Sequence, residues 1–130
     1  MLYGAVNSPL RPVLDEIKAI ADLEFDYLEL AMDPPYCDAA NLRKKRGGIL
    51  ERLKQSHMGL VCHLPTFLST ADLTDRIRQA SIDETLASLE AAADMKALKV
   101  VLHPSYMMGV ATFAPELARA HAMESLEIIV

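Results

Sequence analysis

Tryptophan is absent from this 130-residue sequence, aromatic residues make up only 5%, and there are two cysteines. Cys37 and Cys62 lie in or just after apolar runs and form no CxxC motif, so we expect reduced, buried thiols and no disulfide framework. No apolar run approaches the roughly 20 residues that span a bilayer. The first residues lack the basic start and long apolar core of a secretory signal. We therefore expect a cytoplasmic protein that does not bind membranes.

A positive net charge is also absent. The sequence has 13 Lys and Arg residues against 18 Asp and Glu residues, for a net charge of −5. This balance provides no general attraction to nucleic acid. The basic run RKKR at residues 43–46 could contact DNA phosphates, but we interpret it as a solvated helix start or loop. Nucleic acid is therefore a less expected partner than a small molecule.

Short apolar runs alternate along the chain with segments of helical periodicity. Strands are predicted at residues 2–6, 25–32, 59–63 and 99–103, and helices at about residues 12–20, 41–56, 81–93 and 115–130. The third helix is predicted from a capping box, Ser81 with Glu84, and from an apolar stripe of Ile82, Leu86, Leu89 and Ala93. The predicted apolar side of the last helix consists of Leu117, Ala120, Met123, Leu126 and Val130.

Strands that alternate with helices indicate an α/β fold with a parallel sheet, either doubly wound or a (β/α)8 barrel. No GxGxxG motif follows the first strand and no Walker loop occurs, which disfavours a nucleotide-binding doubly wound sheet. A barrel needs about 250 residues, whereas this chain holds four β-α units and ends inside an apolar helical pattern, MESLEIIV. We expect residues 1–130 to be one domain, the N-terminal half of a TIM barrel truncated at its C-terminus.

Two of the four histidines occupy matching places. His63 in GLVCHLP and His103 in KVVLHPS each end a predicted strand, with a proline close behind. Because the carboxyl ends of consecutive parallel strands are neighbours, these imidazoles are expected side by side, where they could form half of a metal site. Side chains alternate along a strand, so His63 and Val61 should face the barrel axis, and Leu60 and Cys62 the helices. The structural alternative is that each histidine hydrogen-bonds a neighbouring loop.

Two further polar residues are candidates at the same edge of the sheet. Glu29 in DYLEL is predicted to face the axis, where a buried carboxylate needs a partner. A metal, an arginine or a substrate hydroxyl would serve, and the structural alternative is an ion pair with a neighbouring Lys or Arg. Asn7 ends the first strand and could face a substrate at the mouth of the barrel, or be a turn residue before Pro9.

The segments FDYLEL, CHLPTFLSTAD and RQASIDETLASLEAAADMKALKVVLHPS resemble the xylose-isomerase-like TIM barrels. This superfamily contains sugar phosphate isomerases and epimerases together with the endonuclease IV type of abasic-site nuclease. The resemblance covers residues 2–130 and matches the first half of the fold. It implies that His63 and His103 correspond to zinc-binding histidines of the nuclease branch, and Glu29 to an inward acidic position. It also implies a divalent metal, zinc or manganese, whose remaining ligands lie beyond residue 130.

Two departures favour the isomerase branch over the nuclease branch. Ser105 follows the second His-Pro where the nucleases usually have glycine, and the segment GAVNSPLRP lacks their usual histidine and glycine-rich loop. The resemblance thus implies a metal-dependent sugar or sugar phosphate isomerase or epimerase with a sugar-like substrate. In this picture Glu29 is catalytic and grips a substrate hydroxyl, with Asn7 as a second substrate contact, and His63 and His103 bind metal.

Two alternatives to the isomerase remain. The first is an endonuclease IV-like zinc nuclease that acts on abasic sites. The second is a non-catalytic half-barrel whose exposed sheet edges and apolar inner face pair with a second copy. Self-association is expected of any half-barrel, and the 130 residues alone are expected to have no isomerase or nuclease activity.

Overall fold

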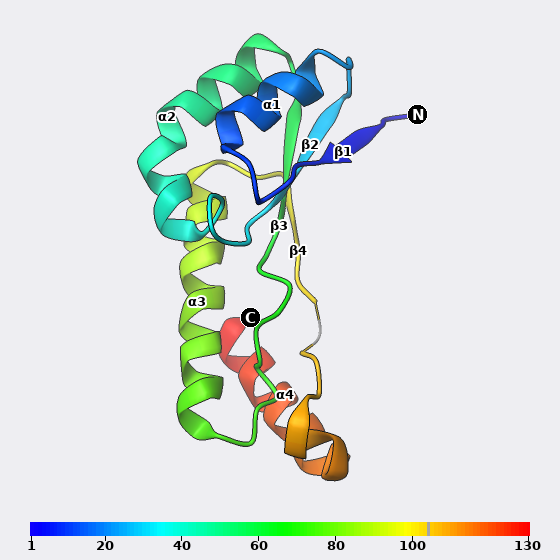
Figure 1. Ribbon diagram of the computed structural model, residues 1–130, viewed down its shortest axis with the longest axis vertical. Helices are drawn as coiled ribbons and strands as arrows, with labels where there is room; N and C mark the ends of the chain where they lie inside the picture. The colour runs from blue at the N-terminus through cyan, green and yellow to red at the C-terminus, as the bar shows by residue number, and fades with distance from the viewer. Residues whose placement is uncertain (104) are drawn as a thin grey trace. The chain divides into compact units, whose positions relative to one another are not determined.

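Four parallel strands form one sheet in sequence order, as the computed structural model of residues 1–103 and 105–130 shows (Figure 1). The strands are β1 (Gly4–Val6), β2 (Tyr27–Ala31), β3 (Gly59–His63) and β4 (Lys99–Val101). Each is paired in parallel with the next. The predicted parallel α/β order is confirmed, although β1, β2 and β4 are shorter than the predicted strands.

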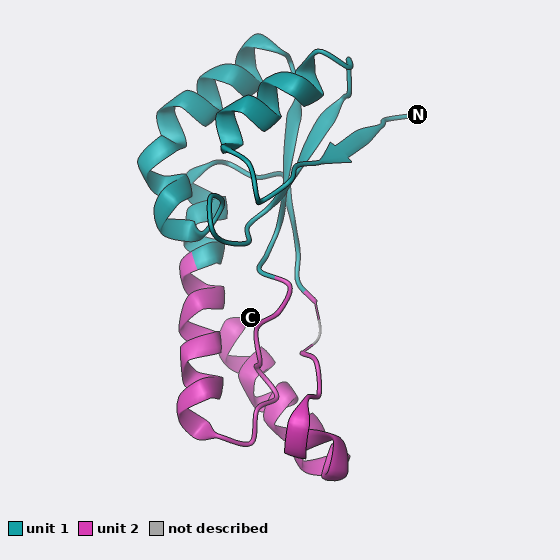
Figure 2. Ribbon diagram, in the orientation of Figure 1, with its two compact units in different colours: residues 1–65, 88–102 teal, residues 66–87, 103–130 magenta. Residues whose placement is uncertain are grey.

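The helices follow the strands in turn: α1 (Val13–Ala21), α2 (Ala39–Gln55), α3 (Asp75–Asp94) and α4 (Pro115–Ile129), with a 3-10 helix, η1 (Gly109–Phe113), before α4. The chain divides into two compact units (Figure 2). Unit 1 contains Met1–Pro65 and Ser88–Leu102, and therefore the whole sheet with α1 and α2. Unit 2 contains Thr66–Ala87 and His103–Val130.

The core of unit 1 lies between one face of the sheet and helices α1 and α2 (Figure 1). The large buried side chains of β2 and β3 alternate in sequence, as a sheet covered on that face requires. Ala31, the last residue of β2, is buried as well. The buried residues of this core are Leu28, Leu30, Leu60 and Cys62 from the strands, Val13, Ile17 and Ile20 from α1, and Leu42, Ile49 and Leu53 from α2. The predicted alternation of β2 and β3 is thus confirmed: the intervening residues Glu29, Val61 and His63 are only half-buried.

At the amino ends of the strands, a tyrosine ring covers part of the opposite face. A Cβ atom placed on Gly4 would overlap the ring of Tyr27, which lies directly over that glycine. Gly4 pairs with Tyr27 in the β1–β2 register, so the missing side chain makes room for the ring of its cross-strand neighbour. The close approach is a reason for glycine at this strand position.

The start and the buried face of α3 differ from the prediction. The helix begins at Asp75, so Ser81 lies inside it and is no cap; its hydroxyl donates to the carbonyl of Ile77 at 2.9 Å and accepts from the amide of Ser69 at 3.1 Å. Of the predicted stripe only Ile82 is buried, and Ala93 is exposed. The buried residues are mostly small or hydroxylated: Ser81, Ile82, Thr85, Ser88, Ala91 and Ala92.

The predicted apolar side of α4 is also wrong, because Leu117, Met123, Leu126 and Val130 are exposed. The buried residues of α4 are Ala118 and Ser125. Ala118 packs in a small cluster with Ala71 and Ala111 of the same unit, and the hydroxyl of Ser125 donates to the carbonyl of Thr70 at 2.7 Å. Small side chains allow the helix backbone to approach its neighbours closely.

Helix α2 holds the basic run, and two of its four cations contact the end of α3 that lies in unit 1. The guanidinium of Arg43 pairs with Glu90 at 2.7 Å, and Nε of Arg46 donates to the carbonyl of Asp94 at 2.8 Å. Asp38 caps the helix by accepting from the amide of Asn41 at 3.1 Å. The interpretation of residues 43–46 as a solvated helix start was therefore incomplete, because Arg43 and Arg46 join two helices.

Candidate functional site

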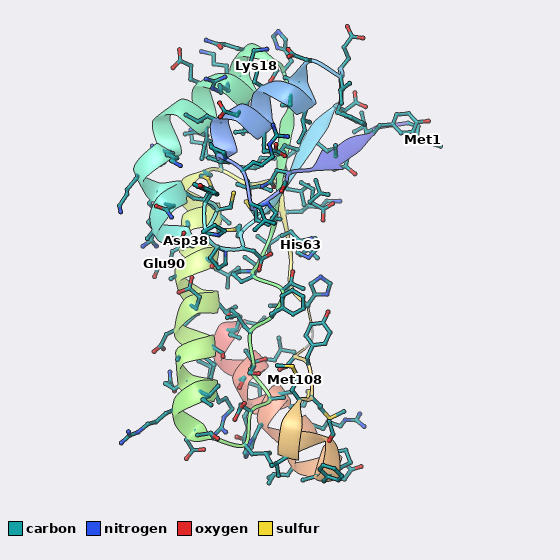
Figure 3. The ribbon with its side chains drawn as sticks, viewed as in Figure 1. Met1, Lys18, Asp38, His63, Glu90 and Met108 are labelled. Atoms are coloured by element: carbon teal, nitrogen blue, oxygen red, sulfur yellow. The ribbon has the colours of Figure 1, made fainter. Side chains whose placement is uncertain are left out.

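A glutamate and a histidine form a close pair on the face of the sheet opposite α1 and α2. Glu29 lies in β2 and His63 ends β3, two adjacent strands on which these residues share the same face. Nδ1 of His63 lies 2.6 Å from Oε1 of Glu29, and their side chains are 20% and 32% exposed. Figure 3 labels His63. Ala31 is the register partner of His63, so the pair sits near the carboxyl ends of its strands.

The chemistry of a carboxylate gives this hydrogen bond a direction. An ionised carboxylate only accepts, so Nδ1 of His63 carries the proton and donates it to Glu29. In the neutral ring this fixes the tautomer and leaves Nε2 as the nitrogen with an acceptor lone pair. The partner that Glu29 requires is therefore His63, and not a Lys or Arg of a neighbouring strand. The sequence predicted both residues but not their contact.

Asn7 is buried at the end of β1, with 3% of its surface exposed. Its Oδ1 accepts from the amide of Ala31 at 2.7 Å, and its Nδ2 lies 3.4 Å from Sγ of Cys37. The amide thus links the end of β1 to the end of β2 and to the loop after it. Because Ala31 pairs with His63 in the sheet, Asn7 supports the backbone at the level of the Glu29–His63 pair.

We expect Asn7→Ala to lower the free energy of unfolding by about 1–3 kcal/mol, because the buried amide of Ala31 loses its acceptor. The measurement is urea denaturation followed by circular dichroism. Gln55→Ala removes an exposed amide from α2 and should change the free energy by less than about 0.5 kcal/mol. Equal effects of the two substitutions would contradict the supporting role of Asn7.

Both cysteines are free and buried, as the sequence predicted. Burial raises the pKa of Cys37 to about 11, although the hydrogen bond from Asn7 acts in the opposite direction. Burial alone raises the pKa of Cys62 to about 12. Neutral thiols in these positions are poor nucleophiles and poor metal ligands, so neither cysteine belongs to the candidate site.

The other three histidines belong to three different segments of the chain. His103 is partly buried in unit 2, after the end of β4, and its predicted pairing with His63 stays a prediction. Pro104, which completes the second His-Pro segment, lies outside the described residues. His57 is exposed in the turn after α2. His121 packs within unit 2, where its Nδ1 lies 2.9 Å from a guanidinium nitrogen of Arg78.

A metal centre is not assembled within the described residues. In residues 1–103 and 105–130, no group of three or more His, Cys, Asp or Glu side chains is placed to hold an ion. The Glu29–His63 pair fits part of such a site, since metal-binding histidines usually donate their other ring N–H to a carboxylate. Nε2 of His63 is the nitrogen that this arrangement would direct at a metal.

No helix of the described chain has the length and apolar content that crossing a bilayer requires.

Comparison with known proteins identifies the family. Residues 17–130 match the model of the xylose isomerase-like TIM barrel family. The chain belongs to this family. The structure, four parallel strands in one sheet with helices between them, matches half of such a barrel. No curated protein matches the sequence.

Three solved structures share this fold. A D-tagatose 3-epimerase-like protein has a TM-score of 0.85 and 21% identity, and the match covers 99% of this chain and 47% of that one. The 3-keto-D-glucoside 4-epimerase YcjR from E. coli has a TM-score of 0.72 and 16% identity, covering 99% and 51%. A D-psicose 3-epimerase solved in the presence of D-fructose has a TM-score of 0.70 and 16% identity, covering 99% and 47%. The chain spans about half the length of these structures.

Proposed function

We propose that this chain carries half of the active site of a metal-dependent sugar or sugar phosphate isomerase or epimerase. The observation that carries the proposal is the hydrogen bond between Glu29 and His63, on the face of the sheet opposite α1 and α2. Catalytic groups of parallel barrels gather at the carboxyl ends of the strands, which is where this pair lies. Membership of the family and three sugar epimerases of the same fold support the choice of reaction.

The two side chains of the pair would have different roles. Glu29 holds the His63 ring in one orientation through Oε1, so that Nε2 is directed toward a ligand. Oε2 of Glu29 is then the oxygen that would accept a hydrogen bond from a substrate hydroxyl. His63 would be one ligand of the divalent ion, zinc or manganese, and His103 stays a second ligand predicted from the sequence alone. When bound, such an ion supplies Lewis-acid polarisation of a sugar carbonyl or hydroxyl.

Asn7 acts in this proposal as a positioning residue. Its amide oxygen already accepts from Ala31, and fixing the end of β2 helps to keep Glu29 within reach of His63. We propose this role in place of the direct substrate contact that the sequence suggested.

The remaining groups would come from four further strands, because residues 1–130 are proposed to be the first half of a barrel. Isomerisation requires a proton to be removed beside a carbonyl and returned, a task for paired carboxylates on those strands. We expect no turnover of any ketose by the 130 residues alone. Turnover that survives further purification and disappears in Glu29→Gln would contradict this division of the site.

Sugar binding tests the proposed function without requiring turnover. We expect D-tagatose, D-psicose or D-fructose, with Zn²⁺ present, to shift backbone NMR signals around Glu29, Ala31 and His63. Glu29→Gln should weaken this binding at least tenfold, whereas Glu51→Gln, on the exposed side of α2, should leave it unchanged. Shifts caused by DNA with an abasic site, and by none of the sugars, would favour the nuclease. No shifts with either would contradict the proposal.

A further inference from the structure

A buried carboxylate organises the loop between β1 and α1. Glu16 lies in the first turn of α1 and is 8% exposed. Its Oε2 accepts from the backbone amide of Ser8 at 2.8 Å, and its Oε1 lies 3.1 Å from a guanidinium nitrogen of Arg11. The guanidinium compensates a negative charge whose burial alone would be costly. The loop therefore folds around the carboxylate of Glu16.

Asn7 begins this loop and holds the end of β2 at two points. The backbone amide of Asn7 donates to the carbonyl of Glu29 at 3.3 Å, and its side-chain oxygen accepts from the amide of Ala31 at 2.7 Å. Asn7 is thus bonded to the backbone of Glu29 itself, whose side chain orients the ring of His63. The position of Asn7 therefore affects the geometry of the Glu29–His63 pair.

The contact between Glu16 and Ser8 fixes the far side of Asn7. The peptide group that joins Asn7 to Ser8 is planar, so a hydrogen bond to the N–H of Ser8 also restrains the carbonyl carbon of Asn7. Pro9 follows and has no backbone N–H. Ser8 is therefore the one backbone donor between Asn7 and Leu10 through which the loop can be held.

We propose that Glu16 is a positioning residue of the candidate site, which holds Asn7, and through Asn7 the Glu29–His63 pair, in place. All of these contacts lie within unit 1. A carboxylate of α1 thus acts on a pair that lies on the opposite face of the sheet. The inference rests on the proposed function, because it assigns Glu16 to the site of that function. The alternative is that Glu16 only stabilises the fold, as any buried residue of α1 does.

The test records the ring nitrogens of the neutral His63 side chain by NMR, in the 130-residue chain without metal. In the unaltered chain we expect the proton on Nδ1, because Glu29 accepts it. Glu16→Met has a side chain of similar length without the acceptor for Ser8, and it should convert the ring to a mixture of both tautomers. Glu16→Gln keeps an oxygen that can accept from Ser8 and should preserve the Nδ1–H form.

Ile17→Val is the matched control, because Ile17 is the next residue of α1 and is completely buried. This substitution removes a methylene group from the core and should lower stability. It should leave the His63 ring signals unchanged, because it removes no hydrogen bond of the loop. Unchanged ring signals in Glu16→Met, or equal changes in Ile17→Val, would overturn the positioning role. So would loss of the Nδ1–H form in Glu16→Gln.

Amide hydrogen exchange in the unaltered chain provides a second measurement if Glu16→Met fails to fold. The Ser8 amide should exchange slowly, because its acceptor is a buried carboxylate, and fast exchange would overturn the proposal. Added Mn²⁺ separates this inference from the proposed function. If Mn²⁺ does not broaden the His63 ring of the unaltered chain, the proposed function is contradicted, whereas the ring tautomer tests Glu16 without a metal.

Discussion

Alkylation of the native chain by iodoacetamide at pH 8 is expected to be about 100-fold slower at Cys37 and about 1,000-fold slower at Cys62 than in the urea-unfolded chain. The thiolate is the reacting form, and burial raises the pKa from 9.0 to about 11 for Cys37 and to about 12 for Cys62. Each pKa unit reduces the thiolate fraction about tenfold at a pH below both values. Mass spectrometry of the separate peptides measures the two rates.

The same shifts make stability depend on pH in the alkaline range. The folded state keeps both thiols neutral more strongly than the unfolded state does, so their contribution to stability is complete below pH 9.0. It is lost as the pH rises through about 11 for Cys37 and about 12 for Cys62.

Equal alkylation rates in the native and unfolded chain would show that the thiols are accessible and would contradict the burial of these residues.

Leu30→Ala is expected to lower the free energy of unfolding by about 2–5 kcal/mol, the range for deleting a fully buried leucine side chain. Leu30 lies in β2 beneath α1 and α2 and is completely buried. The substitution removes apolar contacts and leaves a cavity in a close-packed core. Urea denaturation with an unchanged m-value would identify the loss as one of native stability.

Leu10→Ala is the matched control, because Leu10 is 71% exposed in the loop before α1. Its replacement should change the free energy of unfolding by less than about 0.5 kcal/mol. If the two leucine substitutions had equal effects, the face of β2 that carries Leu30 would not be the core of the sheet.

The strands could be predicted from the sequence because their alternation has a direct physical cause. A sheet covered by helices on one face buries every second side chain, and Leu28, Leu30, Leu60 and Cys62 follow this rule. The order of strands and helices then leaves few topologies, since parallel strands require crossover connections. The β-α order followed from this pattern, and the half-barrel followed from the number of β-α units and the resemblance to the family.

The buried faces of α3 and α4 could not be predicted in the same way. The sequence analysis assigned burial to large apolar residues, whereas the structure buries Thr85, Ser88, Ala118 and Ser125. Two of these hydroxyls donate to backbone carbonyls: Thr85 to the carbonyl of Ser81 at 2.8 Å, four residues earlier, and Ser125 to that of Thr70, 55 residues earlier. Burial of a small polar residue depends on such a partner, and the partner is known only from the fold.

The candidate site shows the same limit. The sequence predicted that Glu29 and His63 both face the barrel axis. This orientation follows from the alternation of side chains along each strand. Their hydrogen bond depends on the β2–β3 register, in which His63 is level with Ala31, and periodicity does not fix that register. The role of Asn7 was missed for a similar reason, since the group that donates to its Oδ1 is the backbone amide of Ala31, 24 residues away.

The metal-binding role of the Glu29–His63 pair is tested most directly by adding substoichiometric Mn²⁺ and recording histidine ring signals by NMR. Paramagnetic broadening should affect the ring of His63 first, and Glu29→Gln should weaken the effect on His63. His57 and His121, which lie elsewhere in the chain, serve as internal controls. If all four rings broaden together, or if the His63 ring is unaffected, the proposed metal-dependent site at the ends of β2 and β3 is contradicted.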